Sequence, residues 1–141
     1  SLNEKLQPFK VESTAQSFEQ RQLQERLQLL ISQKSINESE LQIGKSDLNR
    51  YEGLYKKGVI ATQEIEKQRL IYLQSQKNYK SLLSSISQLK SSINELNRSS
   101  QTTKINENKE NIVLERNVIQ SFYQLKKAIK DKNRNTDARI L

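Results

Sequence analysis

The residues of this chain that could do chemistry are limited to carboxylates, amines, guanidinium groups, hydroxyls and amides. Among the 141 residues there is no Cys and no His. Their absence excludes disulfides and thiolate metal sites, and it removes the commonest general base and metal ligand. No nucleophile with an adjacent base, metal-ligand set or phosphate-binding loop is visible in the sequence. We therefore expect no enzymatic activity, no metal and no cofactor, and a role in binding or assembly.

The net charge of +8 raises the question of a nucleic-acid partner. The densest basic stretch lies near the C-terminal end and comprises Lys126, Lys127, Lys130, Lys132, Arg134 and Arg139. Elsewhere acidic and basic residues alternate, which is typical of solvated helix faces. We expect no nucleic-acid partner. The alternative, binding through the basic tail, would weaken steeply with salt.

The composition predicts long helices. Apolar residues make up 33% of the chain, and there are three Gly and one Pro. So low an apolar share does not build a large spherical core, and so few helix breakers leave few places to turn. No apolar run approaches the ~20 residues that span a bilayer. An all-α protein with a narrow apolar seam fits these properties.

A turn is predicted at residues 57–61. A helix running into Lys57 stops at Gly58, because glycine adopts the left-handed conformation past a helix end without a Cβ clash. Ala61-Thr-Gln-Glu64 then starts the next helix, where free N–H groups need acceptors. The prediction is a long antiparallel coiled-coil hairpin, with one arm at about 10–57, a second at about 62–131 and a frayed basic tail at 132–141.

One heptad frame covers the first arm. Its members are Leu6, Phe9, Leu23, Leu27, Leu30, Lys34, Asn37, Leu41, Gly44, Leu48, Tyr51 and Tyr55. Steps of three and four residues are typical of a helix that meets a partner along a seam. Pro8 predicts a helix start or a joint between two helices. Ser35-Ile-Asn-Glu38 is a capping-box pattern, so a break near residue 35 stays open, although the frame favours a continuous helix.

The second arm repeats the rhythm at Tyr72, Tyr79, Leu82, Ile86, Leu89, Ile93 and Leu96. Residues 97–111 are polar apart from Ile105, so a helix there gains little from burial and a bend is one interpretation. An apolar stripe then resumes from Ile112 to Ile129.

Folding the two arms about the turn predicts a register in which Gly44 faces Tyr72. A small residue opposite a large one keeps the seam evenly spaced without voids. The same register pairs Tyr51 with Ile65, Leu30 with Ile86, Leu27 with Leu89 and Leu23 with Ile93. It leaves the stripe at 112–129 without a partner, which soluble monomers rarely tolerate. We expect a second chain, or sequence upstream of residue 1 in a longer parent protein, to cover it.

The residues around the turn resemble a known family. Arg50-Tyr-Glu-Gly-Leu54, followed by Lys57-Gly-Val-Ile-Ala61-Thr-Gln-Glu64, is similar to the hairpin tip of HlyD-type periplasmic adaptors, also called membrane fusion proteins. In that family an Arg, a Leu four residues later and a Ser seven residues after the Leu dock on a TolC-like channel. Arg50 and Leu54 match this motif. Ala61 stands at the Ser position, with Thr62 beside it as another source of a hydroxyl.

The resemblance covers about residues 12–131 and is closest to adaptors of ABC-type peptide or protein exporters. It implies type I secretion, with a hairpin that links an inner-membrane ABC transporter to a TolC-like outer-membrane channel. The docking residues would be Arg50, Leu54, Gly58, Ala61 and Thr62. It also implies self-association into a ring, a hexamer in related systems, and a location in the periplasm of a Gram-negative bacterium.

The family's lipoyl-like and β-barrel domains have no counterpart in this chain. We therefore expect a fragment of a larger protein that is anchored in the inner membrane. The alternative is a structural coiled-coil module of another assembly, without a channel partner.

Overall fold

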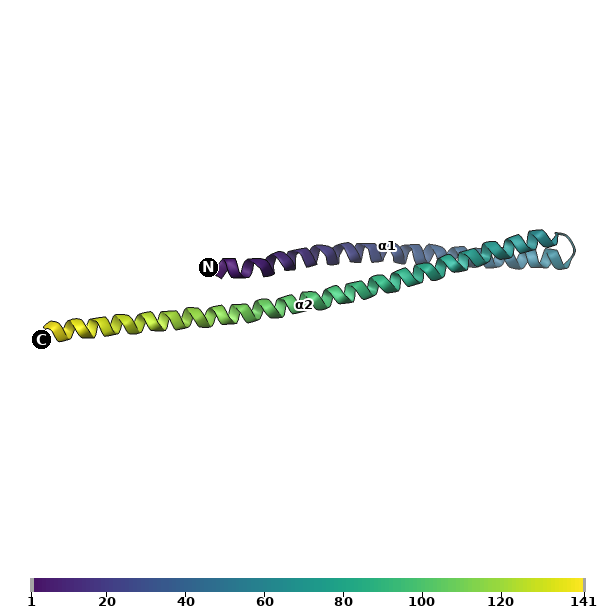
Figure 1. The fold of residues 1–141 in the computed structure, drawn as a ribbon. Helices are drawn as coiled ribbons and strands as arrows, with labels where there is room; N and C mark the ends of the chain where they lie inside the picture. Colours follow the sequence, from purple (N-terminus) through teal and green to yellow (C-terminus); the bar gives the residue numbers. More distant parts are fainter. Residues whose placement is uncertain (1, 141) are drawn as a thin grey trace. The chain divides into compact units, whose positions relative to one another are not determined.

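The described part of the chain consists of two α-helices joined by a turn. The computed structural model describes residues 2–140, and the side chains of residues 3–136. Helix α1 spans Leu2–Lys56 and helix α2 spans Thr62–Ile140. The two helices pack against each other as a hairpin, and no strand occurs among residues 2–140 (Figure 1). The predicted all-α helical hairpin is confirmed.

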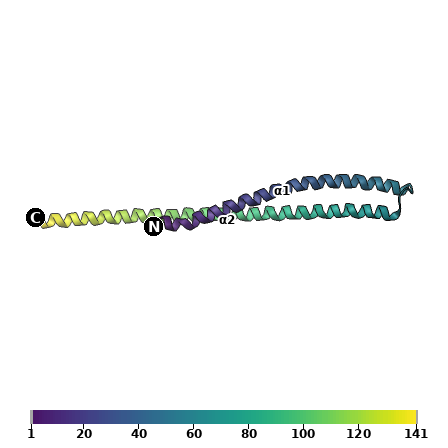
Figure 2. The same ribbon diagram turned by 90° about the horizontal axis from the view of Figure 1, so that it is seen from above.

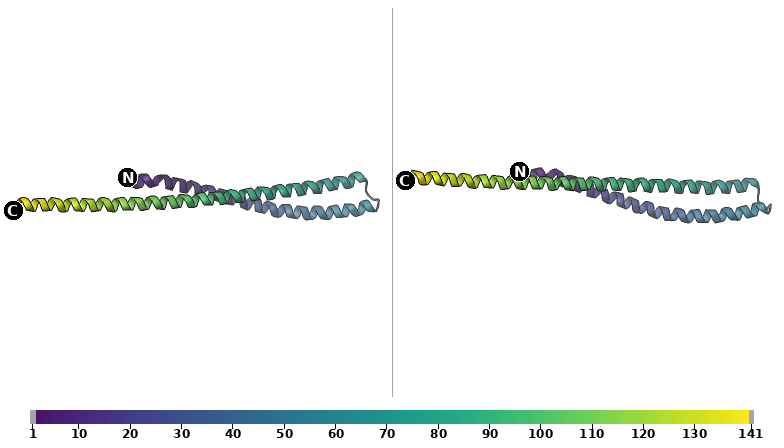
Figure 3. Two further views of the ribbon diagram at one scale, coloured as in Figure 1. Left: turned by 60° about the horizontal axis from the view of Figure 1, so that its bottom comes forward. Right: turned by 90° about the horizontal axis from the view of Figure 1, so that it is seen from below.

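The contacts within the chain form two compact units, which are described separately. The tip unit consists of Phe18–Asn97 and includes the turn, which Figures 2 and 3 show from further directions. The terminal unit combines Ser1–Ser17 with Arg98–Leu141. Both helices contribute to both units.

The end of α1 follows from Gly58. Its φ is 74°, and no other described residue has a positive φ. The Gly58 N–H donates to the Tyr55 carbonyl at 2.9 Å, and the Val59 N–H donates to the Leu54 carbonyl at 3.0 Å. This pair of hydrogen bonds is the Schellman motif, which satisfies carbonyls that the helix end would otherwise leave free. The predicted stop at Gly58 is therefore correct, with the last helical residue at Lys56.

The seam of the tip unit lies where the heptad frame placed it. Ile86, Leu89 and Ile93 are 7%, 7% and 6% exposed. Most of the other predicted seam residues of this unit are half-buried: Leu23, Leu27, Leu30, Leu41, Gly44, Leu48, Tyr51, Tyr72, Tyr79, Leu82 and Leu96. Tyr55, the last residue of the frame, is 37% exposed. A Cβ added at Gly44 would lie 3.3 Å from Tyr72 Cδ2. Gly44 thus faces Tyr72, in the predicted register.

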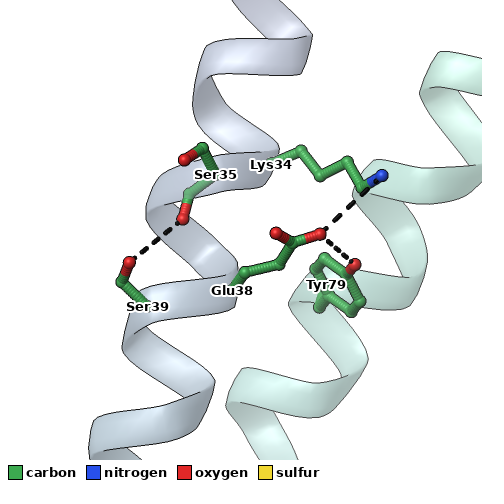
Figure 4. Close-up of polar contacts among 5 residues, drawn as sticks. All are labelled: Lys34, Ser35, Glu38, Ser39 and Tyr79. Carbon is green, nitrogen blue, oxygen red and sulfur yellow. Dashed lines mark hydrogen bonds and ion pairs between the residues drawn. The ribbon is translucent and has the colours of Figure 1, made fainter.

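Helix α1 continues through residue 35 without a break. In the capping-box interpretation, Glu38 would turn back to the backbone of Ser35. Instead, Glu38 Oε1 accepts a hydrogen bond from the Tyr79 hydroxyl across the seam at 2.8 Å and lies 3.7 Å from Lys34 Nζ (Figure 4). The Ser39 hydroxyl donates to the Ser35 carbonyl at 3.3 Å. Because the Glu38 carboxylate bonds to Tyr79 on the other helix, it does not cap a new helix start at Ser35.

The prediction of a start or joint at Pro8 is wrong. Helix α1 begins at Leu2, so Pro8 lies inside it. Proline at this position removes the one hydrogen bond that an N–H would make to the carbonyl of Glu4. Leu6 and Phe9, on either side, are half-buried. Burial of these neighbours favours continuation of the helix across the proline.

Helix α2 is longer than predicted. It is unbroken across residues 97–111 and continues past residue 131 to Ile140, so the expected frayed tail is helical there, while residue 141 lies outside the described residues. The sequence contains no Gly or Pro after residue 58. Lys, Arg, Gln and Glu are good helix formers, so local propensity continues the helix where burial contributes little.

Amide side chains occupy the polar gap between Phe9 and Leu23. In the tip unit, Gln20 Nε2 donates to Asn97 Oδ1 at 2.9 Å. In the terminal unit, Gln16 Nε2 donates to Thr103 Oγ1 at 3.2 Å, and Thr103 is only 5% exposed. Polar layers of this kind fix the register of a helix pair at some cost in stability.

Candidate functional site: the hairpin tip

Arg50 and Leu54 lie one helical turn apart near the end of α1. The Arg50 side chain is 67% exposed, and its Nη2 lies 3.3 Å from Asp47 Oδ1. Its guanidinium carbon is 5.7 Å from the centroid of the Tyr51 ring. Leu54 is half-buried. Exposed ion pairs of this type contribute little, so the guanidinium group remains available to a partner.

Ala61 is the residue that caps the start of α2. Its carbonyl accepts hydrogen bonds from the N–H groups of Glu64 at 3.1 Å and Ile65 at 3.3 Å. Its methyl side chain cannot accept the N–H hydrogen bonds that a Ser would take. Thr62 is the first residue of α2, and its Oγ1 lies 3.3 Å from the Tyr55 hydroxyl. The Thr62 hydroxyl is thus engaged across the turn, one residue past the capping position.

Two isoleucines close the turn on either side of Ala61. Ile65 is 0% exposed, the one large side chain among the described residues that is fully buried. Ile60 is half-buried. These are the positions of a hydrophobic staple, which fixes the angle at which the chain enters a helix. Gly58 is exposed, with nothing within 4 Å of an added Cβ, so its role is conformational.

An ion pair that sequence reasoning missed joins the two helices near the tip. Arg69 Nε and Nη2 donate to Glu52 Oε1 and Oε2 at 2.8 and 3.1 Å. This bidentate hydrogen bonding holds the pKa of Glu52 below its ordinary value, and the positive charges of Arg69 and Lys56 act in the same direction. The pKa of Arg69 is raised for the same reason. Arg50 pairs with Asp47, three residues earlier on the same helix face, whereas Glu52 is two residues away and does not face Arg50.

A second cross-helix contact lies farther along the tip unit. The hydrogen bond from Tyr79 to the Glu38 carboxylate raises the pKa of the Tyr79 hydroxyl, since the phenolate could not donate it and would be repelled by Glu38. The hydrogen bond joins the two helices at this point of the seam. The signal that could have predicted this contact was a carboxylate at residue 38, next to the seam residue Asn37 and opposite the seam residue Tyr79.

The tip offers binding chemistry. Among the described residues no group of three or more Asp or Glu could hold a metal ion. In the same part of the chain, neither helix contains a stretch apolar enough to cross a membrane. What the tip presents is an exposed guanidinium group, a half-buried leucine and a rigid turn.

The structure brings the predicted docking residues to one end of the tip unit. Arg50 and Leu54 come from the last turns of α1, Gly58 from the turn, and Ala61 and Thr62 from the start of α2. Comparison of the chain with protein-family models, with curated proteins and with solved structures finds no match.

Replacing Ala61 by Ser is expected to stabilise the tip by about 0.5–1 kcal/mol, because the new hydroxyl can accept the Glu64 N–H while the Glu64 carboxylate completes the capping box. The measurement is urea unfolding followed by circular dichroism. The matched control is Ala15→Ser, at an exposed position inside α1. There Ser should lower stability by a few tenths of a kcal/mol, about the difference in helix propensity. Equal effects at both positions would contradict the capping argument.

Proposed function

We propose that this chain is the hairpin of an HlyD-type periplasmic adaptor, and that its tip docks on a TolC-like outer-membrane channel. The observation that carries the proposal is the placement of Arg50 and Leu54. They lie one turn apart beside a glycine-capped turn, in the order and spacing of the family's tip motif, and Ala61 follows at the position of the motif's Ser.

The charge and burial of the tip suit docking. The Arg50 guanidinium can form paired hydrogen bonds to a carboxylate or to carbonyls at a helix end of the channel. Its present partner, Asp47, is an exposed neighbour on the same helix, so little is lost when a channel group replaces it. Leu54 can fill a groove between two channel helices.

The tip is also held in one shape before any partner arrives. The Schellman hydrogen bonds, the buried Ile65 and the Glu52–Arg69 ion pair tie the two helices together around the turn. A preorganised surface loses less entropy on binding than a mobile one. In this proposal, Ile65 and the Glu52–Arg69 pair position Arg50 and Leu54 and do not themselves contact the channel.

The wider assembly follows from the same proposal. The full-length protein would be anchored in the inner membrane, bind an ABC transporter and form a ring whose hairpins carry cargo across the periplasm. The hairpin would act without catalysis and without a cofactor. Long helices are suited to this task because each residue adds about 1.5 Å of length to a rigid rod.

A structural coiled-coil module without a channel partner is the second candidate. The observation that favours it is the number of large apolar side chains on the outward face of α1 in the tip unit, including Leu29, Ile36 and Ile43, which are 71%, 53% and 63% exposed. Such residues fit lateral packing against other helices. Under this alternative, substitutions at the tip would not affect the function.

Docking is tested by the double substitution Arg50→Glu with Leu54→Ser. We expect loss of channel binding and of export, with helicity unchanged by circular dichroism. The single substitution Arg50→Glu separates the charge from any loosening of the tip by Leu54→Ser, and it should weaken binding on its own.

The matched control for the charge makes the same reversal elsewhere on α1, with Lys45→Glu at an exposed position. It should leave binding and export unaltered. Normal channel binding by the tip variant would contradict the proposal and favour the coiled-coil alternative.

A further inference from the structure

The C-terminal part of α2 carries a large exposed apolar surface. Ile112, Ile119, Phe122 and Ile129 are 50%, 68%, 67% and 54% exposed. Val118, Tyr123 and Leu125 lie beside them and are 62%, 70% and 60% exposed. All belong to the terminal unit. A surface of this size usually marks an interaction site.

This surface is a second seam, separate from the one that contacts α1. The residues that α2 turns toward α1 are buried or half-buried: Thr103, Glu107, Glu110, Asn111 and Leu114. The second seam is defined by eight exposed residues: Asn108, Ile112, Glu115, Ile119, Phe122, Lys126, Ile129 and Asn133. Their steps alternate between four and three residues, the pattern of a coiled-coil face. Helix α1 does not cover the second seam.

The second seam is complementary to itself when its direction is reversed. Read from either end, its residue types run amide, apolar, charged, apolar, apolar, charged, apolar, amide, and the two charges have opposite signs. We propose that a second copy of this chain packs antiparallel on the second seam, with Ile119 facing Phe122 of the other copy. The remaining layers then pair Ile112 with Ile129, Glu115 with Lys126 and Asn108 with Asn133.

Every one of these layers is chemically matched. Two apolar layers flank the two-fold axis, and beyond each of them a carboxylate meets an ammonium group. The outermost apolar layers and then the paired amides follow. An isologous interface repeats each contact twice, so the Glu115–Lys126 pair occurs on both sides of the axis.

A parallel arrangement of the same helices is disfavoured. It would place Glu115 against Glu115 and Lys126 against Lys126, and like charges in facing layers destabilise a helix pair. Two flanking pairs also favour the antiparallel arrangement, because Val118 meets Leu125 on one side and Arg116 meets Tyr123 on the other. A third pair, Lys109 with Lys130, is repulsive, but both ammonium groups reach water at the outer edge, where the repulsion is screened.

The surface has a hollow for Phe122, the largest side chain of the second seam. A shallow hollow of about 330 Å³ is lined by Leu114, Glu115, Val118 and Ile119. Phe122 of the second copy faces Ile119 in the proposed pair and is positioned to enter this hollow. Side chains that fill such hollows supply most of the energy of a helix interface.

This inference does not depend on the proposed function, because it uses no residue of the tip. An antiparallel pair also differs from a ring of parallel adaptors, so the two arrangements are alternative states of the chain. Failure of channel docking would leave the second seam unaffected, and loss of the pair would leave docking by Arg50 and Leu54 unaffected.

The first test is a charge-reversal cycle followed by sedimentation equilibrium at low salt. We expect the unmodified chain to dimerise reversibly. Glu115→Lys or Lys126→Glu alone should raise the dimer dissociation constant about tenfold, because each creates two like-charge layers, and the double variant should return it to within about threefold. In a parallel dimer, the single variants would exchange one like-charge layer for another and change little.

The second test maps the facing residues by disulfide formation, and the absence of native Cys makes it unambiguous. The double variant Asn108→Cys with Asn133→Cys should form disulfides between position 108 of one copy and position 133 of the other. The control, Val113→Cys with Ala128→Cys, places thiols in the same facing relation but on the outer side of α2, and it should remain reduced.

Phe122→Ser should abolish the dimer and leave helicity unchanged, since Phe122 is exposed within one copy. A chain that stays monomeric at all concentrations would overturn the inference. So would disulfides that join position 108 to position 108, or a dimer that is insensitive to Phe122→Ser.

Discussion

Replacing Ile65 by Ala is expected to destabilise the hairpin by about 2–4 kcal/mol. Ile65 is fully buried at the point where α2 begins, and removing its branched side chain leaves a cavity that the tightly turned backbone cannot close. Alanine has the higher helix propensity and recovers a few tenths of a kcal/mol, so the observed loss measures the packing.

Urea unfolding at one fixed protein concentration measures this effect, because any self-association makes the apparent stability depend on concentration. Leu70→Ala is the matched control, since Leu70 lies on the same helix and is 65% exposed. It should change stability by less than about 0.5 kcal/mol. Hydrogen exchange of the amides near the turn should accelerate only in the Ile65 variant. Similar losses for the two variants would show that Ile65 does not close the tip.

Replacing Gly44 by Leu is expected to destabilise the tip unit by about 1–3 kcal/mol. An added Cβ would already lie 3.3 Å from Tyr72 Cδ2, so the rest of a leucine side chain must displace the tyrosine ring or separate the helices. The matched control is Gly53→Leu on the same helix, where nothing lies within 4 Å of an added Cβ. There the substitution should stabilise the chain by about 0.5–1 kcal/mol, because leucine is the better helix former.

Exchanging the large and the small side chain of this layer tests whether contact with Tyr72 causes the loss of stability in the Gly44→Leu variant. The double variant Gly44→Leu with Tyr72→Ala places a large side chain on the opposite side of the same layer and should recover much of the stability lost in the Gly44→Leu variant. Effects of contacting residues are not additive, and the departure from additivity measures their interaction. Purely additive effects would show that the two residues do not meet.

In the tip, the residues that stabilise the fold differ from the residue proposed to bind the partner. Ile65, Gly58 and the Glu52–Arg69 pair hold the turn together, whereas Arg50 is exposed and loosely paired. Substitutions in the first group should change unfolding and docking together. Arg50→Glu should change docking alone, because an exposed charge on a helix surface contributes little to folding.

The sequence by itself was sufficient to predict the helices, the turn and the seam, because each depends on local or periodic properties. The left-handed glycine acts through the backbone of a few neighbouring residues. The seam repeats every three or four residues for many turns, so single exceptions do not obscure it. The pairing of Gly44 with Tyr72 could be predicted because the turn position and the seam spacing together set the register of the two helices.

Only the tertiary structure decided which polar side chains meet across the seam, and that helix α1 continues across Pro8 and helix α2 past residue 131. Glu52 bonds to Arg69, Glu38 to Tyr79 and Gln20 to Asn97, and each choice depends on the reach of flexible side chains between two helices. Pro8 stays helical because burial of its neighbours in the hairpin outweighs the lost hydrogen bond. The polar C-terminal residues stay helical because the helix propensity of α2 is uninterrupted. Which distant residues pair depends on how the surfaces of the two helices face each other. The sequence of either helix alone does not determine it.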